Sequence, residues 1–212
     1  IVDLGIPIYL QRETAMKPES GSEVFSITFT AGVILFCVYF VSAGIAMKLV
    51  YPEVSFFMFA LIALMIYISS LVTLCNKALS GIRNFKSQFI AFLIPRILIV
   101  AAFAVCIYVF SLGMNSLISI MLSGFALNLL IVLFYLQRSG IKYSVRYFSF
   151  SKIRVILGAS IPLGLTVIFN LLYDKLDVLL ISKMIGFTET AYYNVGYGLY
   201  KSTAIAFSFL LV

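Results

Sequence analysis

The stretch VFSITFTAGVILFCVYFVSAGIAM, residues 24–47, decides the fold class, because it has no charged side chain between Glu23 and Lys48. A helix that crosses the hydrocarbon core of a bilayer needs about 20 consecutive apolar residues. The whole chain has the same character: 63% of its 212 residues are hydrophobic and 11% are charged. Soluble domains have about 45–50% apolar and about 25% charged residues. The sequence therefore predicts an all-α integral membrane protein.

Further apolar runs predict a polytopic bundle of about six complete transmembrane helices. The predicted spans cover residues 24–47, 54–76, 88–110, 115–136, 155–182 and 191–212. Residues 97–137 are uncharged but too long for one helix, and the turn residues of the segment 111–116 divide them. Residues 1–10, which include Asp3, are interpreted as the end of an earlier helix. The apolar ends of the chain predict a piece of a longer protein.

Lysine and arginine gather in alternate connections between the predicted spans, and this asymmetry indicates the orientation. One set of connections holds ten of the 15 basic residues, namely Arg12, Lys17, Lys77, Arg83, Lys86, Arg138, Lys142, Arg146, Lys152 and Arg154. The opposite connections hold Lys48 and Lys183. We expect the first set to face the cytoplasm. The formal charge of +7 therefore reflects topology, and we expect no binding of nucleic acid.

The basic segment 138–154 contains no acidic residue and is the best candidate for a domain boundary. It is interpreted either as an amphipathic linker held by anionic lipid headgroups or as a plain cytoplasmic loop.

Residues that commonly carry enzyme chemistry are scarce. The chain has no histidine, and its three cysteines, Cys37, Cys75 and Cys106, lie in apolar runs without metal-ligand spacing. It also lacks a Gly-rich phosphate loop and a GxSxG motif. The sequence predicts no catalytic residue, no metal and no cofactor, and favours a transporter over an enzyme.

Charges inside the predicted spans are the candidate functional residues, because each costs several kcal/mol at the bilayer centre. Arg96 follows Pro95 and lies about 12 Å into its helix. It either faces a water-filled cavity and binds an anionic substrate, or extends to the cytoplasmic headgroups. Lys201 lies about 15 Å into the last predicted helix. It is the strongest candidate for substrate binding.

A polar stripe interrupts the fifth predicted span. Asn170, Asp174 and Asp177 have helical spacing and share one face, whereas Lys175 points about 100° away from Asp174. We interpret Asn170 as a substrate-binding residue, and the three charged residues as a coupling site or a cavity ion pair with a neighbouring helix. The alternative is that the helix ends near Tyr173.

Residues 161–207, IPLGLTVIFNLLYDKLDVLLISKMIGFTETAYYNVGYGLYKSTAIAF, resemble polysaccharide flippases of the multidrug/oligosaccharidyl-lipid/polysaccharide exporter superfamily. The matching positions are Pro162-Leu163, Asp177, Gly186, Tyr193-Asn194 and Lys201. Residues 3–15, DLGIPIYLQRETA, resemble the end of the family's second helix, and residues 76–85 resemble the connection after helix four. The resemblance covers essentially the whole chain, as helices two to eight of a protein with twelve to fourteen.

This resemblance implies two six-helix lobes. Residues 1–137 would form most of the N-terminal lobe, residues 138–154 a basic cytoplasmic linker, and residues 155–212 the first two helices of the C-terminal lobe. It also implies a flippase for undecaprenyl-pyrophosphate-linked oligosaccharide units, such as O-antigen or capsule repeats. Such a protein moves these units from the inner to the outer leaflet of the bacterial inner membrane.

In a flippase of this kind, Arg96 and Lys201 would hold the pyrophosphate and sugar in a cationic cavity. Asp174 and Asp177 would balance these charges or couple transport to H⁺ or Na⁺. A cation-coupled multidrug exporter of the same superfamily is an alternative, but the basic residues disfavour it. A membrane acyltransferase or polysaccharide polymerase is a second alternative, but would need a histidine or a large polar loop with catalytic residues.

Overall fold

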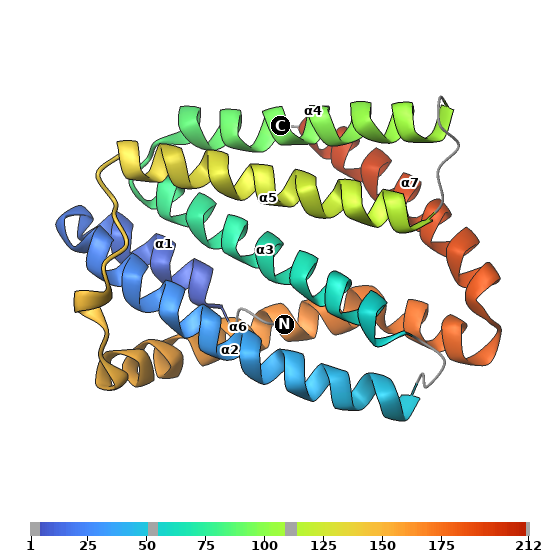
Figure 1. The fold of residues 1–212 in the computed structure, drawn as a ribbon, viewed down its shortest axis with the longest axis horizontal. Helices are drawn as coiled ribbons and strands as arrows, with labels where there is room; N and C mark the ends of the chain where they lie inside the picture. The colour runs from blue at the N-terminus through green and yellow to red at the C-terminus, as the bar shows by residue number, and fades with distance from the viewer. Residues whose placement is uncertain (1–4, 51–54, 109–113, 211–212) are drawn as a thin grey trace. The chain divides into compact units, whose positions relative to one another are not determined.

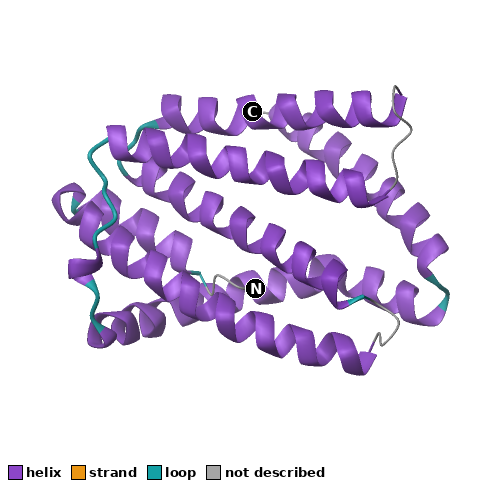
Figure 2. Cartoon of the chain, in the orientation of Figure 1, coloured by secondary structure: helices purple, strands orange, loops and turns teal. Residues whose placement is uncertain are grey.

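The computed structural model describes residues 5–50, 55–108 and 114–210 (Figure 1). Asp3 and most of the predicted turn at 111–116 lie outside these residues. The described chain is helical and contains no strand (Figure 2). Its helices are α1 Ile6–Met16, α2 Gly21–Val50, α3 Phe56–Gly81, α4 Phe85–Tyr108, α5 Met114–Arg138, α6 Phe150–Met184 and α7 Phe187–Leu210. The chain forms two compact units, which meet inside α6: the first unit ends at Leu165 and the second begins at Thr166.

Five helices in the described part of the chain are long and apolar enough to cross a membrane. They are α2 with the turn before it, α3, α4, the Ser116–Arg138 part of α5, and α6. This result confirms the predicted polytopic helical membrane protein. Helix α7 matches the sixth predicted span and has 24 residues, but it is not one of these five. Its crossing of the membrane stays a prediction.

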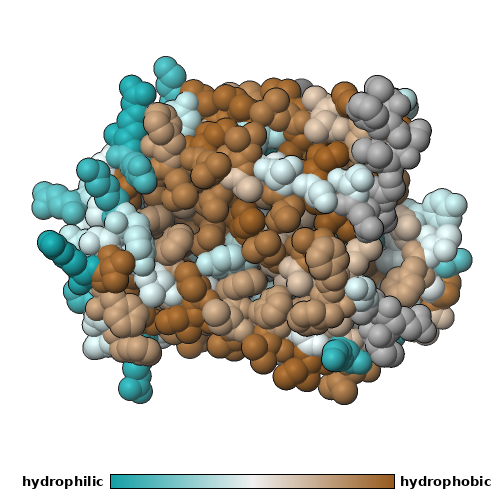
Figure 3. All heavy atoms as spheres, in the orientation of Figure 1, coloured by the Kyte–Doolittle hydropathy of each residue, from teal (hydrophilic) through white to brown (hydrophobic). Residues whose placement is uncertain are grey.

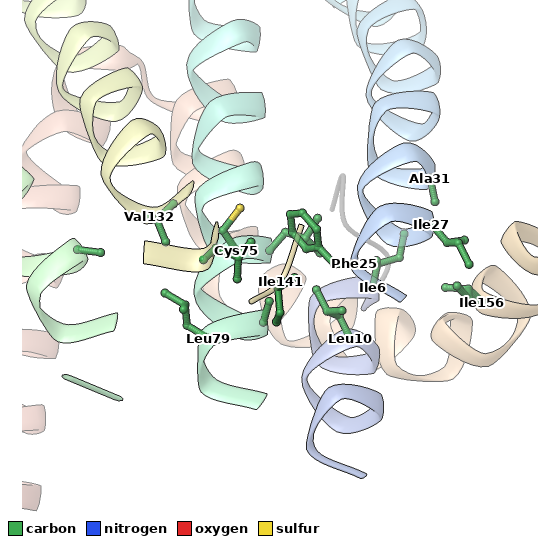
Figure 4. Close-up of a cluster of buried hydrophobic side chains, with 14 of the residues drawn as sticks. Ile6, Leu10, Phe25, Ile27, Ala31, Cys75, Leu79, Val132, Ile141 and Ile156 are labelled. Atoms are coloured by element: carbon green, nitrogen blue, oxygen red, sulfur yellow. The ribbon is translucent and has the colours of Figure 1, made fainter. Parts of the chain in front are cut away.

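The core of the first unit forms around the short helix α1, which packs between α2 and α3. Ile6 and Leu10 are at most 2% exposed. They belong to one apolar cluster with Phe25 of α2 and Leu79 of α3 (Figure 4). Ile156 of α6 extends this cluster. A helix as short as α1 is marginal alone, so this burial is what stabilises it.

The connection between α5 and α6 runs along the start of α2. The backbone N–H groups of Lys142 and Ser144 donate to Ser22 Oγ at 3.1 Å and Ser26 Oγ at 3.0 Å. Lys152 forms an ion pair with Glu23. Helix α6 begins at Phe150, earlier than the predicted position 155. The end of the basic segment 138–154 is therefore the first turn of a spanning helix.

Glycines permit two close approaches in this unit. A Cβ atom at Gly81 would lie 2.9 Å from Thr14 Cβ and 3.0 Å from the carbonyl oxygen of Gln11. Gly5 has φ +76°, and a Cβ there would lie 2.7 Å from the backbone N of Gly164 and 2.8 Å from the Ser160 carbonyl oxygen. Helix α1 thus meets α3 at one end and α6 at the other, in each case through a glycine.

Replacement of Gly81 by Ala should destabilise the protein by about 1–3 kcal/mol, because the added methyl group overpacks the contact with α1. Gly32→Ala is the matched control, since a Cβ at this helical glycine meets nothing within 4 Å. Thermal unfolding of the purified variants in detergent measures the difference. Equal midpoints for Gly81→Ala and Gly32→Ala would show that α1 and α3 do not pack this closely.

Charged side chains gather at one end of the first unit, whereas the flanks of its helices are apolar (Figure 3). The short connections between α1 and α2, between α3 and α4, and between α5 and α6 all lie at this end (Figure 1). The connections carry Lys17, Arg83, Lys142 and Arg146, and the helix ends beside them carry Arg12, Lys86 and Arg138. Away from this end, apolar side chains such as Val38 and Val100 are exposed at 62% and 67%. The fold therefore has the surface that a bilayer requires.

The basic end should face the cytoplasm, because lysine and arginine are retained on that side during insertion. Truncated fusions ending after Arg138 should be fluorescent with green fluorescent protein and inactive with alkaline phosphatase. Fusions ending after Met184 should behave in the opposite way. The reverse pattern at both positions would overturn the orientation.

Candidate functional site

Helix α6 continues without interruption through the polar stripe to Met184. The interpretation that it ends near Tyr173 is therefore wrong. Because the helix is continuous, Asn170, Asp174 and Asp177 lie on one face, as their spacing predicts. A short turn after Met184 leads into α7, so the two helices of the second unit are direct neighbours in the chain.

Both aspartates are engaged by side chains of α7. Lys201 Nζ donates to Asp174 Oδ2 at 2.5 Å, and the hydroxyl of Tyr193 donates to Asp177. The pair of Asp174 and Lys201 is about half-exposed in the protein alone. Lys201, predicted from its depth as a substrate ligand, is thus bound to a carboxylate of the neighbouring helix.

Tyrosines extend this cluster along α7. Tyr193 and Tyr197 stack with ring centroids 5.9 Å apart and an interplanar angle of 10°. Tyr200 continues the stack at 6.3 Å from Tyr197. The Lys201 ammonium lies 5.1 Å from the centroid of the Tyr197 ring, within range of a cation–π interaction. The arrangement combines flat aromatic rings, whose faces and hydroxyls can contact a sugar, with two carboxylates and one cation.

The remaining two predicted residues of this region are exposed. Asn170 and Lys175 lie on α6, and neither makes a side-chain hydrogen bond or ion pair with the described residues. Their roles in substrate binding and coupling stay predictions. The tyrosines were not predicted as site residues, although the spacing Tyr193, Tyr197, Lys201 repeats every four positions and marks one helical face.

Arg96 lies in the first unit, on α4. Helix α4 begins at Phe85, which places Arg96 about 16 Å along the helix, deeper than the predicted 12 Å. It lines a pocket of about 480 Å³ between α3, α4 and α5. The other strongly polar side chains of this pocket are Asn76, Lys77, Gln88 and Asn128.

Phenylalanines form the apolar part of the same pocket. Phe85, Phe89 and Phe92 lie on one face of α4, and Arg96 continues that face one turn further. The guanidinium of Arg96 lies 5.2 Å from the centroid of the Phe92 ring. This stripe is visible in the sequence FKSQFIAFLIPR (85–96), but was not used to predict a site.

Neither site has the donor set of a metal centre. The described residues contain no group of three or more His, Cys, Asp or Glu side chains that could hold a metal ion. The cysteines are free thiols, with Cys75 and Cys106 buried.

The ion pair between α6 and α7 should be necessary for correct folding, because each charge on its own is costly in an apolar environment. Lys201→Met should therefore lower the amount of folded protein in the membrane several-fold. The double variant Asp174→Asn/Lys201→Met removes both charges and should restore most of it. Size-exclusion chromatography of a fluorescent fusion measures the folded amount. Equal loss in the single and double variants would contradict the pairing.

The sequence was also compared with known proteins. The family described as polysaccharide biosynthesis protein matches residues 1–211. No curated protein and no solved structure matches the chain. The match covers all the helices described above, including both sites. The chain belongs to the polysaccharide biosynthesis protein family.

Proposed function

We propose that the chain is part of a flippase that moves undecaprenyl-pyrophosphate-linked oligosaccharides from the inner to the outer leaflet of the bacterial inner membrane. The observation that carries the proposal is the charged and aromatic cluster between α6 and α7. The chain also belongs to a polysaccharide biosynthesis family and has five helices apolar and long enough to cross a membrane. Both facts support a membrane step in glycan production.

The chemistry of the cluster suits this cargo. In the absence of substrate, Asp174 neutralises Lys201 and lowers the cost of placing an ammonium group in an apolar helix. A pyrophosphate carries more negative charge than one carboxylate, so it would compete with Asp174 for Lys201. The released Asp174 would then be available to a proton or Na⁺, which is a physical route to coupled transport. The tyrosine rings beside it offer faces and hydroxyls to the sugar.

The other two functions fit the cluster less well. A site for cationic drugs would leave the aspartates free, but here Lys201 and Tyr193 engage them. A polymerase or acyltransferase would need a histidine or a large polar loop with catalytic residues, and the sequence has no histidine. We therefore propose a carrier and not an enzyme.

Lys201→Ala should abolish most export of the glycan per folded molecule in the membrane, because the substrate loses its cation. Lys201→Arg should retain part of the export, since the charge remains. Lys48→Ala removes an exposed lysine outside the cluster and serves as the control. The measurement is the leaflet distribution of the lipid-linked glycan in cells that depend on each variant.

A defective flippase should leave the lipid-linked units on the inner leaflet. Accumulation on the outer leaflet would instead indicate a polymerase. Wild-type export by Lys201→Ala would remove Lys201 from the mechanism, and Arg96→Ala tests the second cation separately.

A further inference from the structure

The pocket between α3, α4 and α5 contains acceptors that the described part of the chain leaves unsatisfied. Asn128 is 3% exposed, and its Oδ1 atom has no hydrogen-bond partner. The Oδ1 atom of Asn76 is buried in the same way and also lacks a partner. Both residues line the pocket. Buried polar groups are nearly always hydrogen-bonded, so two open acceptors at one pocket point to a ligand with donors.

The same pocket contains two cations without an acid. Lys77 and Arg96 line it, and within residues 5–50, 55–108 and 114–210 no carboxylate pairs with either. Lys77 Nζ donates to Gln11 Oε1 at 3.1 Å, which uses one of its three N–H groups. Arg96 contacts the face of Phe92 and keeps its N–H groups for another partner. The charge of the pocket is complementary to an anion.

Phenylalanines form the rest of the pocket wall and suit a hydrocarbon chain. Phe85 and Phe89 are 60% and 62% exposed along α4, and Phe125 of α5 lies across the pocket from them. The volume of about 480 Å³ falls within the range of about 300–1,000 Å³ that is typical of small-molecule sites. The pocket thus combines charge, acceptors and apolar rings.

We propose that this pocket binds an amphipathic phosphate ester whose headgroup carries hydroxyl groups. The phosphate would bind Lys77 and Arg96, the hydroxyls would donate to Asn76 and Asn128, and the hydrocarbon would lie on the phenylalanines. On binding, rotation about χ2 of Asn128, which is a soft torsion, would turn its buried oxygen toward a hydroxyl group of the ligand. The pocket belongs to the first unit and the α6–α7 cluster to the second. With the lipid-linked glycan as its ligand the inference rests on the proposed function, whereas with a bilayer lipid as its ligand it is independent of that function.

Two sources can supply this chemistry: a phosphoglycerol lipid of the bilayer, or the sugar-phosphate end of a lipid-linked glycan. The full protein in detergent is titrated with phosphatidylglycerol, phosphatidylethanol and phosphatidylcholine of equal chain length, and binding is measured by native mass spectrometry. Phosphatidylethanol keeps the negative phosphate but lacks hydroxyls, and phosphatidylcholine lacks the net charge. Phosphatidylglycerol should bind about 3- to 10-fold tighter than phosphatidylethanol, as expected for one or two added hydrogen bonds.

Three variants assign the binding to the pocket. Asn128→Leu should lower the affinity for phosphatidylglycerol toward that for phosphatidylethanol, with Asn76 keeping one hydrogen bond, and should leave the affinity for phosphatidylethanol unchanged. Arg96→Gln should weaken both anionic lipids by about 10-fold, the loss expected for a charge-assisted bond. Lys86→Gln is the matched control, because Lys86 is an exposed lysine of the same helix that does not line this pocket.

Competition then separates the two sources. A polyprenyl-pyrophosphate disaccharide that displaces phosphatidylglycerol from the wild type assigns the pocket to the lipid-linked glycan, and failure to displace it assigns the pocket to a bilayer lipid. Equal affinity for phosphatidylglycerol and phosphatidylethanol overturns the proposal, as does equal weakening by Arg96→Gln and Lys86→Gln. Loss of glycan export in Lys201→Ala is a separate result and tests only the α6–α7 cluster.

Discussion

Hydrocarbon cannot solvate a polar group, and most features of this chain follow from that constraint. The spanning helices satisfy their own backbone hydrogen bonds. Most lysines and arginines lie at one end of the first unit, where water and headgroups reach them. Two of the exceptions have polar or charged neighbours: Lys201 is paired with Asp174, and Arg96 lies at the wall of a polar pocket. Because such residues reduce stability, their presence inside apolar helices is strong evidence for function.

Lys201 and Arg96, the two cations deep in their helices, are each also stabilised by an aromatic ring. Lys201 lies over Tyr197 and Arg96 over Phe92, at 5.1 and 5.2 Å from the ring centroids. An aromatic face carries partial negative charge and attracts a cation without adding an ionisable group. In both sites the aromatic ring therefore stabilises the cation without using any of its N–H groups. A site that receives an anion intermittently requires this balance between stability and availability.

Five of the six spans could be predicted from the sequence, because a run without charges is a local signal that needs no knowledge of packing. The prediction placed the start of α6 too late, since hydropathy treats Lys152 and Arg154 as the end of a span. In the structure Ile153 and Ile156 pack into the core, and this burial extends the helix backwards. The stripe of Asn170, Asp174 and Asp177 was visible, and an ion pair was one of its two interpretations. Its partner Lys201 could not be chosen from spacing alone.

The pocket was the hardest feature to predict. Asn76 and Asn128 lie on different helices, 52 positions apart in the chain, and no local pattern relates them. The line of phenylalanines that ends at Arg96 is a local pattern, but an apolar stripe is also what any lipid-facing helix presents. Only the packing of α3, α4 and α5 brings these residues together around one cavity.

Helix α6 belongs to both compact units, and Pro162 near the boundary affects how easily the helix bends. Pro162 removes the N–H group that would bond the Gly158 carbonyl, so the helix is easier to bend there than elsewhere. At the same level Gly5 lies against the backbone of Ser160 and Gly164 and the Cβ atom of Leu163, at 2.7–2.8 Å from where its own Cβ would be. The level of α6 that has lost a backbone hydrogen bond is therefore also the level held against Gly5. Tilting of the outer half of α6 about this point would carry Asp174 sideways while the inner half stays fixed in the core.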